Sequence, residues 1–148
     1  EEWEFAGGKS LFDRARQEAR ESRIDGRPDI LGSDIDARSI DLCKKHAKKA
    51  GVMVNWKVAP LKELSTDKSG GLIVCNPPYG ERMMEKREAE ALYREMRHKF
   101  DELDNWQVSV ITAYRDFERI YGKRADKRRK LSNGGMVCTM YQYFKRND

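Results

Sequence analysis

A continuous apolar run at residues 71–75, ended by two prolines, constrains the fold most. A run of this kind, Gly-Leu-Ile-Val-Cys, is typical of a short strand that is buried on both faces of a parallel sheet. Proline fixes φ and lacks an N–H, and it pushes the preceding residue toward extended geometry. Pro77 and Pro78 therefore end the strand on a stiff, extended turn, in which Asn76 and Pro77 are each held extended by the proline that follows.

The rest of the chain alternates between helical and strand-like segments. Apolar residues at helical spacing predict helices at residues 11–22, 37–50 and 86–103, and a short helix with Phe117, Ile120 and Tyr121 inward and Gly122 at its end. Strand-like segments fall at residues 29–33, 52–58 and 106–112, and a hairpin is indicated where residues 128–132 and 136–144 flank Asn-Gly-Gly. This order predicts an α/β fold whose mostly parallel sheet is covered on both faces and carries an antiparallel C-terminal hairpin. Ser10 and Asp36 are expected to cap the first two helices, and Gly51 to end the second.

Composition limits the class of protein. The 148 residues suit one domain with a single core, and no apolar run approaches the length of a membrane span. No signal peptide is visible, and the odd number of cysteines (Cys43, Cys75 and Cys138) argues against a disulfide framework. No Cys/His cluster suggests a metal site, and His46 and His98 fall on charged helix faces where we expect them to be solvated. These observations favour a reduced, cytoplasmic protein.

Basic charge is concentrated near the C-terminus. The net charge of +5 and the pI of about 9.1 give mild support for a polyanionic partner. The dense block comprises Lys123, Arg124, Lys127, Arg128, Arg129 and Lys130. Such a block either contacts phosphates or protects a solvated edge strand, and the sequence leaves both explanations open.

Two polar clusters follow predicted parallel strands, where α/β sheets bind ligands. The first is Gly32-Ser33-Asp34-Ile35-Asp36. A carboxylate at such a strand end can accept hydrogen bonds from both ribose hydroxyls of a nucleotide-type cofactor, and Asp34 is best placed to do so. Ile35 would lie flat on an adenine ring. The alternative is that both aspartates serve only as a turn and a helix cap.

The second cluster is Asn76-Pro77-Pro78-Tyr79-Gly80. In the extended turn, the Asn76 amide oxygen and the Pro77 carbonyl form two fixed acceptors, which suit a planar NH₂ donor such as the exocyclic amine of a base. Tyr79 offers a flat surface on which a base can stack. The alternative is a rigid strand-ending turn with a surface tyrosine, but the tetrapeptide at this position favours the functional interpretation.

These residues resemble the class I S-adenosylmethionine-dependent methyltransferases. The Asn-Pro-Pro-Tyr motif is that family's signature for methylation of exocyclic amino nitrogens. The longer string at residues 76–82, together with residues 32–36 and the ending Arg124-Ala125-Asp126-Lys127 followed by Asn133-Gly134, resembles the large-subunit rRNA guanine-N2 methyltransferase group. Members of that group carry a THUMP RNA-binding domain before a Rossmann-like catalytic domain.

The resemblance implies a role for each matching residue. Asp34 would bind the ribose of S-adenosylmethionine and Ile35 its adenine, while Asn76, Pro77 and Pro78 would form the catalytic turn that holds the target amine. Tyr79 would stack on a base extruded from the RNA, most simply 23S rRNA. Catalysis would come mainly from aligning the amine with the methyl group, without a general base. No metal is implied.

The sequence departs from the family pattern in three respects. No glycine-rich loop after a first strand is present, because Gly7-Gly8 has neither a preceding strand nor the right spacing. The stretch at residues 57–61 lacks the acid that often reaches the cofactor adenine, and no THUMP domain is present. We therefore expect residues 1–148 to be the C-terminal part of a catalytic domain, inactive in isolation. The alternatives are an N6-adenine methyltransferase on DNA or RNA, and a non-catalytic nucleic-acid-binding fragment.

Overall fold

A computed structural model describes residues 7–24, 26, 29–80, 83–133 and 135–144 of the chain. The helices are α1 (Gly8–Glu21), α2 (Ala37–Ala50), α3 (Met83–Asp101) and α4 (Phe117–Tyr121), with a short 3-10 helix, η2 (Leu61–Glu63). The strands are β1 (Leu31–Asp34), β2 (Asn55–Val58), β3 (Gly71–Cys75), β4 (Trp106–Thr112), β5 (Lys127–Asn133) and β6 (Met136–Tyr143). Helices and strands alternate up to β4, and the chain ends in the predicted antiparallel hairpin.

The ends of α2 follow from the residues that flank it. The Asp36 side chain accepts a hydrogen bond from the backbone N–H of Arg38, and Gly51 ends the helix at a φ of 67°, as predicted. The prediction for α1 is wrong at its start. The helix begins at Gly8, and the left-handed Gly7 precedes it without a side-chain cap, so Ser10 lies inside the first turn.

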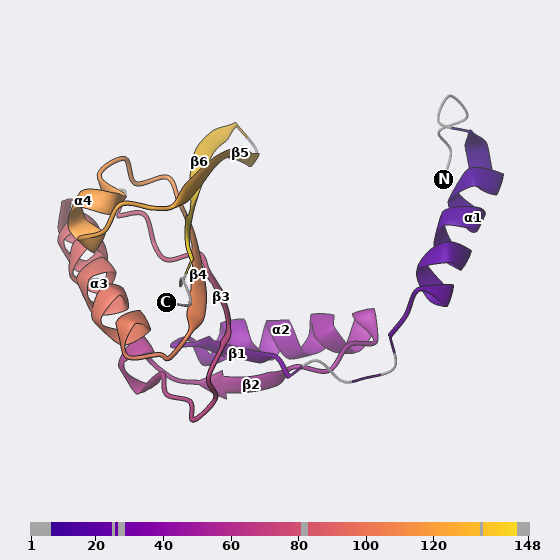
Figure 1. Ribbon diagram of the computed structural model, residues 1–148, viewed down its shortest axis with the longest axis horizontal. Helices are drawn as coiled ribbons and strands as arrows, with labels where there is room; N and C mark the ends of the chain where they lie inside the picture. Colours follow the sequence, from indigo (N-terminus) through magenta and orange to yellow (C-terminus); the bar gives the residue numbers. More distant parts are fainter. Residues whose placement is uncertain (1–6, 25, 27–28, 81–82, 134, 145–148) are drawn as a thin grey trace.

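The strands form two sheets instead of the one predicted. β1 and β2 pair in parallel, and the second sheet has the order β3-β4-β6-β5. In that sheet β3 and β4 are parallel, whereas β4–β6 and β6–β5 are antiparallel. No ladder joins the sheets within the part of the chain that the structure describes. Figure 1 shows β1, β2 and α2 extending away from the four-stranded sheet, with α1 standing apart from both.

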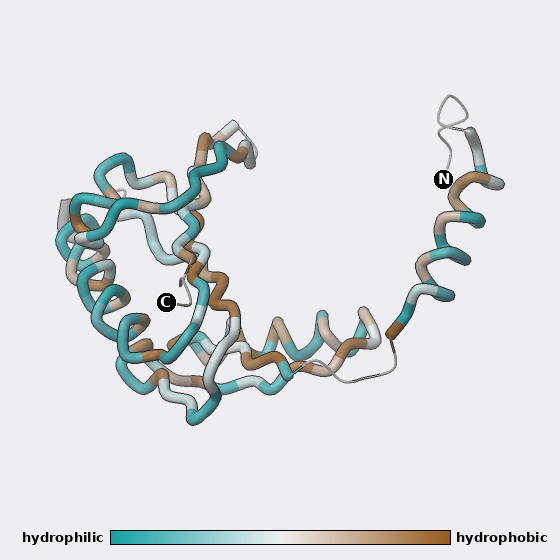
Figure 2. The backbone as a smooth tube through the Cα atoms, in the orientation of Figure 1, coloured by the Kyte–Doolittle hydropathy of each residue, from teal (hydrophilic) through white to brown (hydrophobic). Residues whose placement is uncertain are grey.

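The hydrophobic core lies between the four-stranded sheet and helices α3 and α4 (Figure 1). Its residues come from all of these elements: Ala89, Tyr93, Met96, Phe100, Val108, Val110, Phe117, Ile120, Tyr121, Tyr141 and Tyr143. Figure 2 shows hydrophobic residues along β3 and β4, whereas much of α3 is hydrophilic. Burial of the apolar stripe of α3 and of Phe117, Ile120 and Tyr121 confirms the helical periodicity seen in the sequence.

The opposite face of β3 is exposed, so the prediction of a strand buried on both faces is wrong. Successive side chains of a strand point to opposite faces. Ile73 and Cys75 are partly buried against the core, while Leu72 and Val74 are 60% and 58% exposed on the other face. The helices that pack on this sheet, α3 and α4, cover one face of it (Figure 1).

A glycine lies under a tryptophan ring in each sheet. Gly32 pairs with Trp56 across β1 and β2, and Gly71 pairs with Trp106 across β3 and β4. A Cβ added at Gly32 would lie 2.2 Å from the Trp56 ring, and one at Gly71 would lie 2.6 Å from the Trp106 ring. Glycine is therefore required at both of these positions.

Candidate functional site

The Pro-Pro turn, residues 76–80, leaves the carboxyl end of β3. Pro77 is buried, whereas Asn76 and Pro78 are exposed at the sheet edge. Gly80 closes the turn at a φ of 66°, and a Cβ there would lie 2.6 Å from the Cα of Lys86 in α3. The turn is thus pressed against the first part of α3, which only glycine permits at this position.

A buried tyrosine of α3 anchors this turn. The Tyr93 hydroxyl donates a hydrogen bond of 2.6 Å to the Pro78 carbonyl and lies 3.4 Å from Oγ1 of Thr112. Sequence periodicity identified Tyr93 only as part of an apolar stripe and missed this role. The Pro77 carbonyl, the predicted acceptor, has no hydrogen bond to another described residue.

Asn76 and Tyr79 are brought together in a contact that the sequence did not reveal. The Tyr79 hydroxyl donates to Oδ1 of Asn76 at 2.7 Å, and the Cys138 thiol lies 3.8 Å from the same hydroxyl. Burial raises the pKa of Tyr79, and the contact with Cys138 raises it further, so the hydroxyl remains a neutral donor. An amide oxygen has two lone pairs, so one remains for a second donor.

An open cleft of about 410 Å³ adjoins the Pro-Pro turn. It is lined by Tyr79, Gly80, Lys86, Ala113, Tyr114, Arg115, Asp116 and Met136. Its volume lies in the range of small-molecule sites, and its lining combines two aromatic rings with charged groups. The loop at residues 113–116 was missed in the sequence, although it also follows the carboxyl end of a strand, β4, where ligands bind in such folds.

Tyr114 forms a second aromatic wall of the cleft. Its hydroxyl hydrogen-bonds the carboxylate of Glu90, and the ammonium of Lys86 lies 5.7 Å from its ring centroid. Burial, then the contact with Glu90, raises the pKa of Tyr114 to about 12, whereas the hydrogen bond lowers the pKa of Glu90. The Tyr114 ring also meets Tyr93 edge-on, with centroids 5.5 Å apart, which fixes its position.

The cysteine that precedes the Pro-Pro turn is unreactive at neutral pH. All three cysteines are free, and Cys75 immediately precedes Asn76. Burial raises the pKa of the Cys75 thiol to about 12, so it stays protonated at neutral pH and is a poor nucleophile. Its side chain packs instead toward the Ser109 carbonyl, at 3.9 Å.

The Asp34 turn, residues 34–36, ends β1 in the smaller sheet. Oδ1 of Asp34 accepts a hydrogen bond of 2.8 Å from the backbone N–H of Asp36, and its carbonyl accepts one from Ala59. Ile35 is 74% exposed. The Asp34 and Ile35 side chains are thus both exposed at the end of β1. No described hydrogen bond joins this turn to the Pro-Pro turn.

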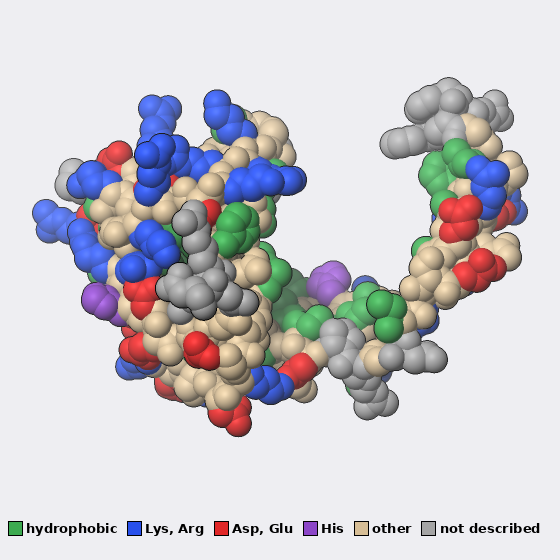
Figure 3. All heavy atoms as spheres, viewed as in Figure 1, with side chains coloured by type: hydrophobic (Ala, Val, Ile, Leu, Met, Phe, Trp, Pro, Cys, Tyr) green, Lys and Arg blue, Asp and Glu red, His purple; other side chains and the backbone are tan. Residues whose placement is uncertain are grey.

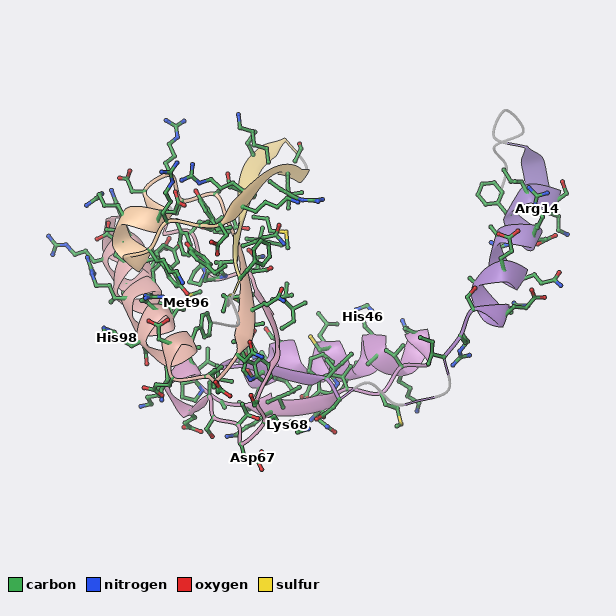
Figure 4. The ribbon with its side chains drawn as sticks, viewed as in Figure 1. Arg14, His46, Asp67, Lys68, Met96 and His98 are labelled. Carbon is green, nitrogen blue, oxygen red and sulfur yellow. The ribbon has the colours of Figure 1, made fainter. Side chains whose placement is uncertain are left out.

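Other polar residues lie outside these two turns. His46 projects from α2 and His98 from the side of α3 away from the sheet, and both are exposed, as expected (Figure 4). Within the described ranges, no three or more His, Cys, Asp or Glu side chains gather as metal ligands. A search of the same residues finds no helix long and apolar enough to span a membrane.

Comparison with known proteins assigns the chain to a family. The UPF0020 family model, described as an RMKL-like methyltransferase domain, matches residues 2–142. The chain belongs to this family. The match covers both strand-ending turns and the basic hairpin, which confirms the resemblance to methyltransferases drawn from the motifs.

Individual relatives agree with this assignment. "Putative RNA methyltransferase YpsC" of Bacillus subtilis is 40% identical over 99% of this chain and 38% of its own length. "Ribosomal RNA large subunit methyltransferase K/L" of Legionella pneumophila is 32% identical over 89% of this chain and 19% of its own length. The crystal structure of SMU.472, described as "a putative methyltransferase complexed with SAH", superposes with a TM-score of 0.83 and 36% identity, covering 95% of this chain and 38% of that one. The chain thus spans well under half the length of these relatives.

Proposed function

We propose that the protein containing this chain transfers a methyl group from S-adenosylmethionine to an exocyclic base amine in RNA. The observation that carries the proposal is the Pro-Pro turn, in which Asn76 is exposed, the Pro77 carbonyl has no described hydrogen-bond partner, and Tyr79 and Gly80 line a cleft with aromatic walls. Support comes from relatives named RNA and ribosomal RNA methyltransferases and from a solved relative that binds SAH.

The turn would act by fixing the direction of a lone pair. The two N–H groups of the amine donate to the Asn76 amide oxygen and the Pro77 carbonyl, while the Tyr79 hydroxyl keeps the other lone pair of Asn76 occupied. The Tyr79 ring, which lines the cleft, stacks on the base. With both protons held, the nitrogen lone pair is aimed at one point, and alignment of this kind is a large part of catalysis.

Asp34 and Ile35 would hold the adenosine part of the methyl donor. One oxygen of Asp34 is used within the turn, and the other has no described partner, so it can accept from ribose. The bound donor supplies a methyl group on a positively charged sulfur. As the new N–C bond forms, the C–S bond breaks with its electron pair going to sulfur, and the methylated amine then loses one proton to solvent.

Guanine N2 of large-subunit rRNA is the specific target that we infer. The large-subunit name of the Legionella relative supports the RNA, and the resemblance of residues 76–82 to the guanine-N2 group supports the base. Guanine N2 and adenine N6 present similar NH₂ groups to two acceptors, so the base must be identified by direct analysis of the product.

The test uses the full-length protein with methyl-labelled S-adenosylmethionine and rRNA from a strain that lacks the gene. We expect the label in N2-methylguanosine after digestion to nucleosides. Label in N6-methyladenosine would show that the target base is adenine and not guanine. Retained RNA binding with no transfer by the full-length protein would contradict the proposed activity and favour a binding module.

A further inference from the structure

The outer strand of the larger sheet carries four consecutive basic residues. β5 is the edge strand of the order β3-β4-β6-β5, and Lys127, Arg128, Arg129 and Lys130 are all exposed on it. Figure 3 shows Lys and Arg side chains gathered over this end of the molecule, above β5 and α4. Two further basic residues, Lys123 and Arg124, lie just before the strand and are separated from it by Ala125 and Asp126.

The four residues divide between the two faces of the hairpin. Arg128 lies opposite Tyr141, on the face that packs against α4, and its guanidinium lies 2.7 Å from the Glu118 carboxylate. Lys127 and Arg129 point to the other face, because side chains alternate along a strand. Neither forms an ion pair with another described residue, so their charges remain available to a ligand.

That second face is continuous with the candidate site. Residues opposite each other in an antiparallel pair share a face, and Arg129 lies opposite Met140. On the same face of β6, Cys138 contacts the Tyr79 hydroxyl and Met136 lines the cleft. Arg129 and Lys127 therefore lie on the same face of the hairpin as Met136, at increasing distance from the cleft.

We propose that Lys127 and Arg129 bind phosphates of the RNA strand that flanks the target base. The proposal rests on the proposed function, because it names how the same site holds its polymer substrate. Arg and Lys are the side chains that position a nucleic-acid backbone without reading its sequence. Both are exposed to solvent. The opposing role, protection of an edge strand from aggregation, requires no RNA contact.

The experiment measures RNA affinity as a function of salt concentration. The Lys127→Gln/Arg129→Gln variant of the full-length protein is compared with wild type, using a fluorescent single-stranded rRNA fragment and no methyl donor. Each phosphate contact contributes about 0.7 to the slope of log affinity against log salt for single strands. We expect the slope to decrease in magnitude by about 1.4. An unchanged slope, or salt-independent binding by wild type, would overturn the proposal.

A matched variant controls for net charge. Lys45→Gln/Lys49→Gln removes the same charge from the exposed side of α2, and we expect the wild-type slope. An equal decrease in both variants would show general attraction and overturn the assignment to β5. The measurement is independent of catalysis: a reduced slope without methyl transfer would leave this surface standing and reject the proposed function. Transfer with an unchanged slope would reject the surface alone.

Discussion

The Pro-Pro turn after β3 and the Asp34 turn after β1 both follow parallel strands, but different forces hold them. The Pro-Pro turn is tied to the core by Tyr93, whose ring is fully buried and whose hydroxyl binds the Pro78 carbonyl. The Asp34 turn is held mainly by a local hydrogen bond, in which the Asp36 N–H donates to the side-chain Oδ1 of Asp34. Ile35 remains 74% exposed beside it.

This difference separates two chemical tasks. A turn that must aim two acceptors at one amine benefits from attachment to a rigid core, because alignment depends on positions fixed to within a fraction of an ångström. A carboxylate that accepts from ribose hydroxyls needs only to be exposed and charged. We therefore expect changes in the Pro-Pro turn to alter methyl transfer, and changes in the Asp34 turn to alter cofactor affinity.

The largest expected effect is at Asn76. Asn76→Ala removes one of the two acceptors, and we expect methyl transfer to fall about a hundredfold or more while cofactor affinity stays near wild type. Asn76→Asp retains an oxygen at the same place and should keep more activity than alanine. Single-turnover transfer and calorimetric binding of S-adenosylmethionine measure the two quantities. Equal loss of transfer and binding would mean that the turn is only structural.

At Asp34 we expect the reverse: weaker cofactor binding with little change in the rate of methyl transfer at saturating cofactor. Asp34→Ala removes a charge-assisted hydrogen bond, worth about 1.5–3 kcal/mol, so cofactor affinity should fall roughly tenfold to a hundredfold. Transfer should recover at saturating cofactor. Asp36→Ala is the matched control, because Asp36 caps α2 and its loss should cost about 1 kcal/mol of unfolding free energy without weakening cofactor binding. Transfer that stays low at saturation would contradict a pure binding role.

The sequence predicted these two turns because local chemistry fixes both. Prolines restrict the chain around Asn76 wherever they occur, and Asp36 and Gly51 mark the ends of α2 without reference to the rest of the fold. The strand at residues 106–112 was placed with the observed bounds, and the short helix closed by Gly122 was placed at the observed position, because their apolar residues recur at strand and helix periods.

The features that the sequence did not predict depend on contacts between residues far apart in the chain. The hydrogen bond from Tyr93 to Pro78 joins residues 15 positions apart, and a tyrosine in an apolar stripe gives no sign of its partner. The contribution of Tyr114 to the cleft likewise depends on how β4 lies beside β3. Exposure of Leu72 and Val74 was missed because an apolar strand looks the same whether one face or both faces are covered.

Substitution of the glycine beneath each tryptophan compares how well the two sheets tolerate an added methyl group. Gly71→Ala and Gly32→Ala each place a methyl group against an indole ring, and overpacking of this kind costs about 1–3 kcal/mol. We expect the larger loss at Gly71, because a 3.0 Å hydrogen bond to the Lys68 carbonyl holds the Trp106 ring in place. Urea unfolding midpoints measure the loss, with the exposed Ser33→Ala as a control. A larger loss at Gly32 would reverse the ranking.

Removing the Tyr93 hydroxyl tests the anchor directly. Tyr93→Phe leaves the Pro78 carbonyl without its donor, and we expect a loss of about 1 kcal/mol in unfolding free energy together with reduced methyl transfer. Tyr143→Phe removes a hydroxyl that binds the Lys123 carbonyl at 3.2 Å, away from the turn, and should affect stability alone. If the two variants transferred methyl groups equally well, the anchor would have no part in aligning the substrate.

The smallest expected effect is an alkaline loss of stability confined to the larger sheet. Tyrosines in the core that packs on this sheet have raised pKa values, about 12 for Tyr114 and higher than the ordinary 10.0 for Tyr121, mainly through burial. A raised pKa in the folded state stabilises the fold fully below pH 10, and this contribution is lost as pH rises through the folded-state pKa. Urea midpoints should therefore be level just below pH 10 and fall above it.

Tyr114→Phe should make the fall in urea midpoint shallower, because one ionising group is removed. A fall of the same steepness would show that Tyr114 takes no part. Fluorescence of Trp56 and Trp106, each isolated by replacing the other tryptophans with Phe, then locates the loss: an earlier alkaline transition at Trp106 than at Trp56 would place it in the larger sheet.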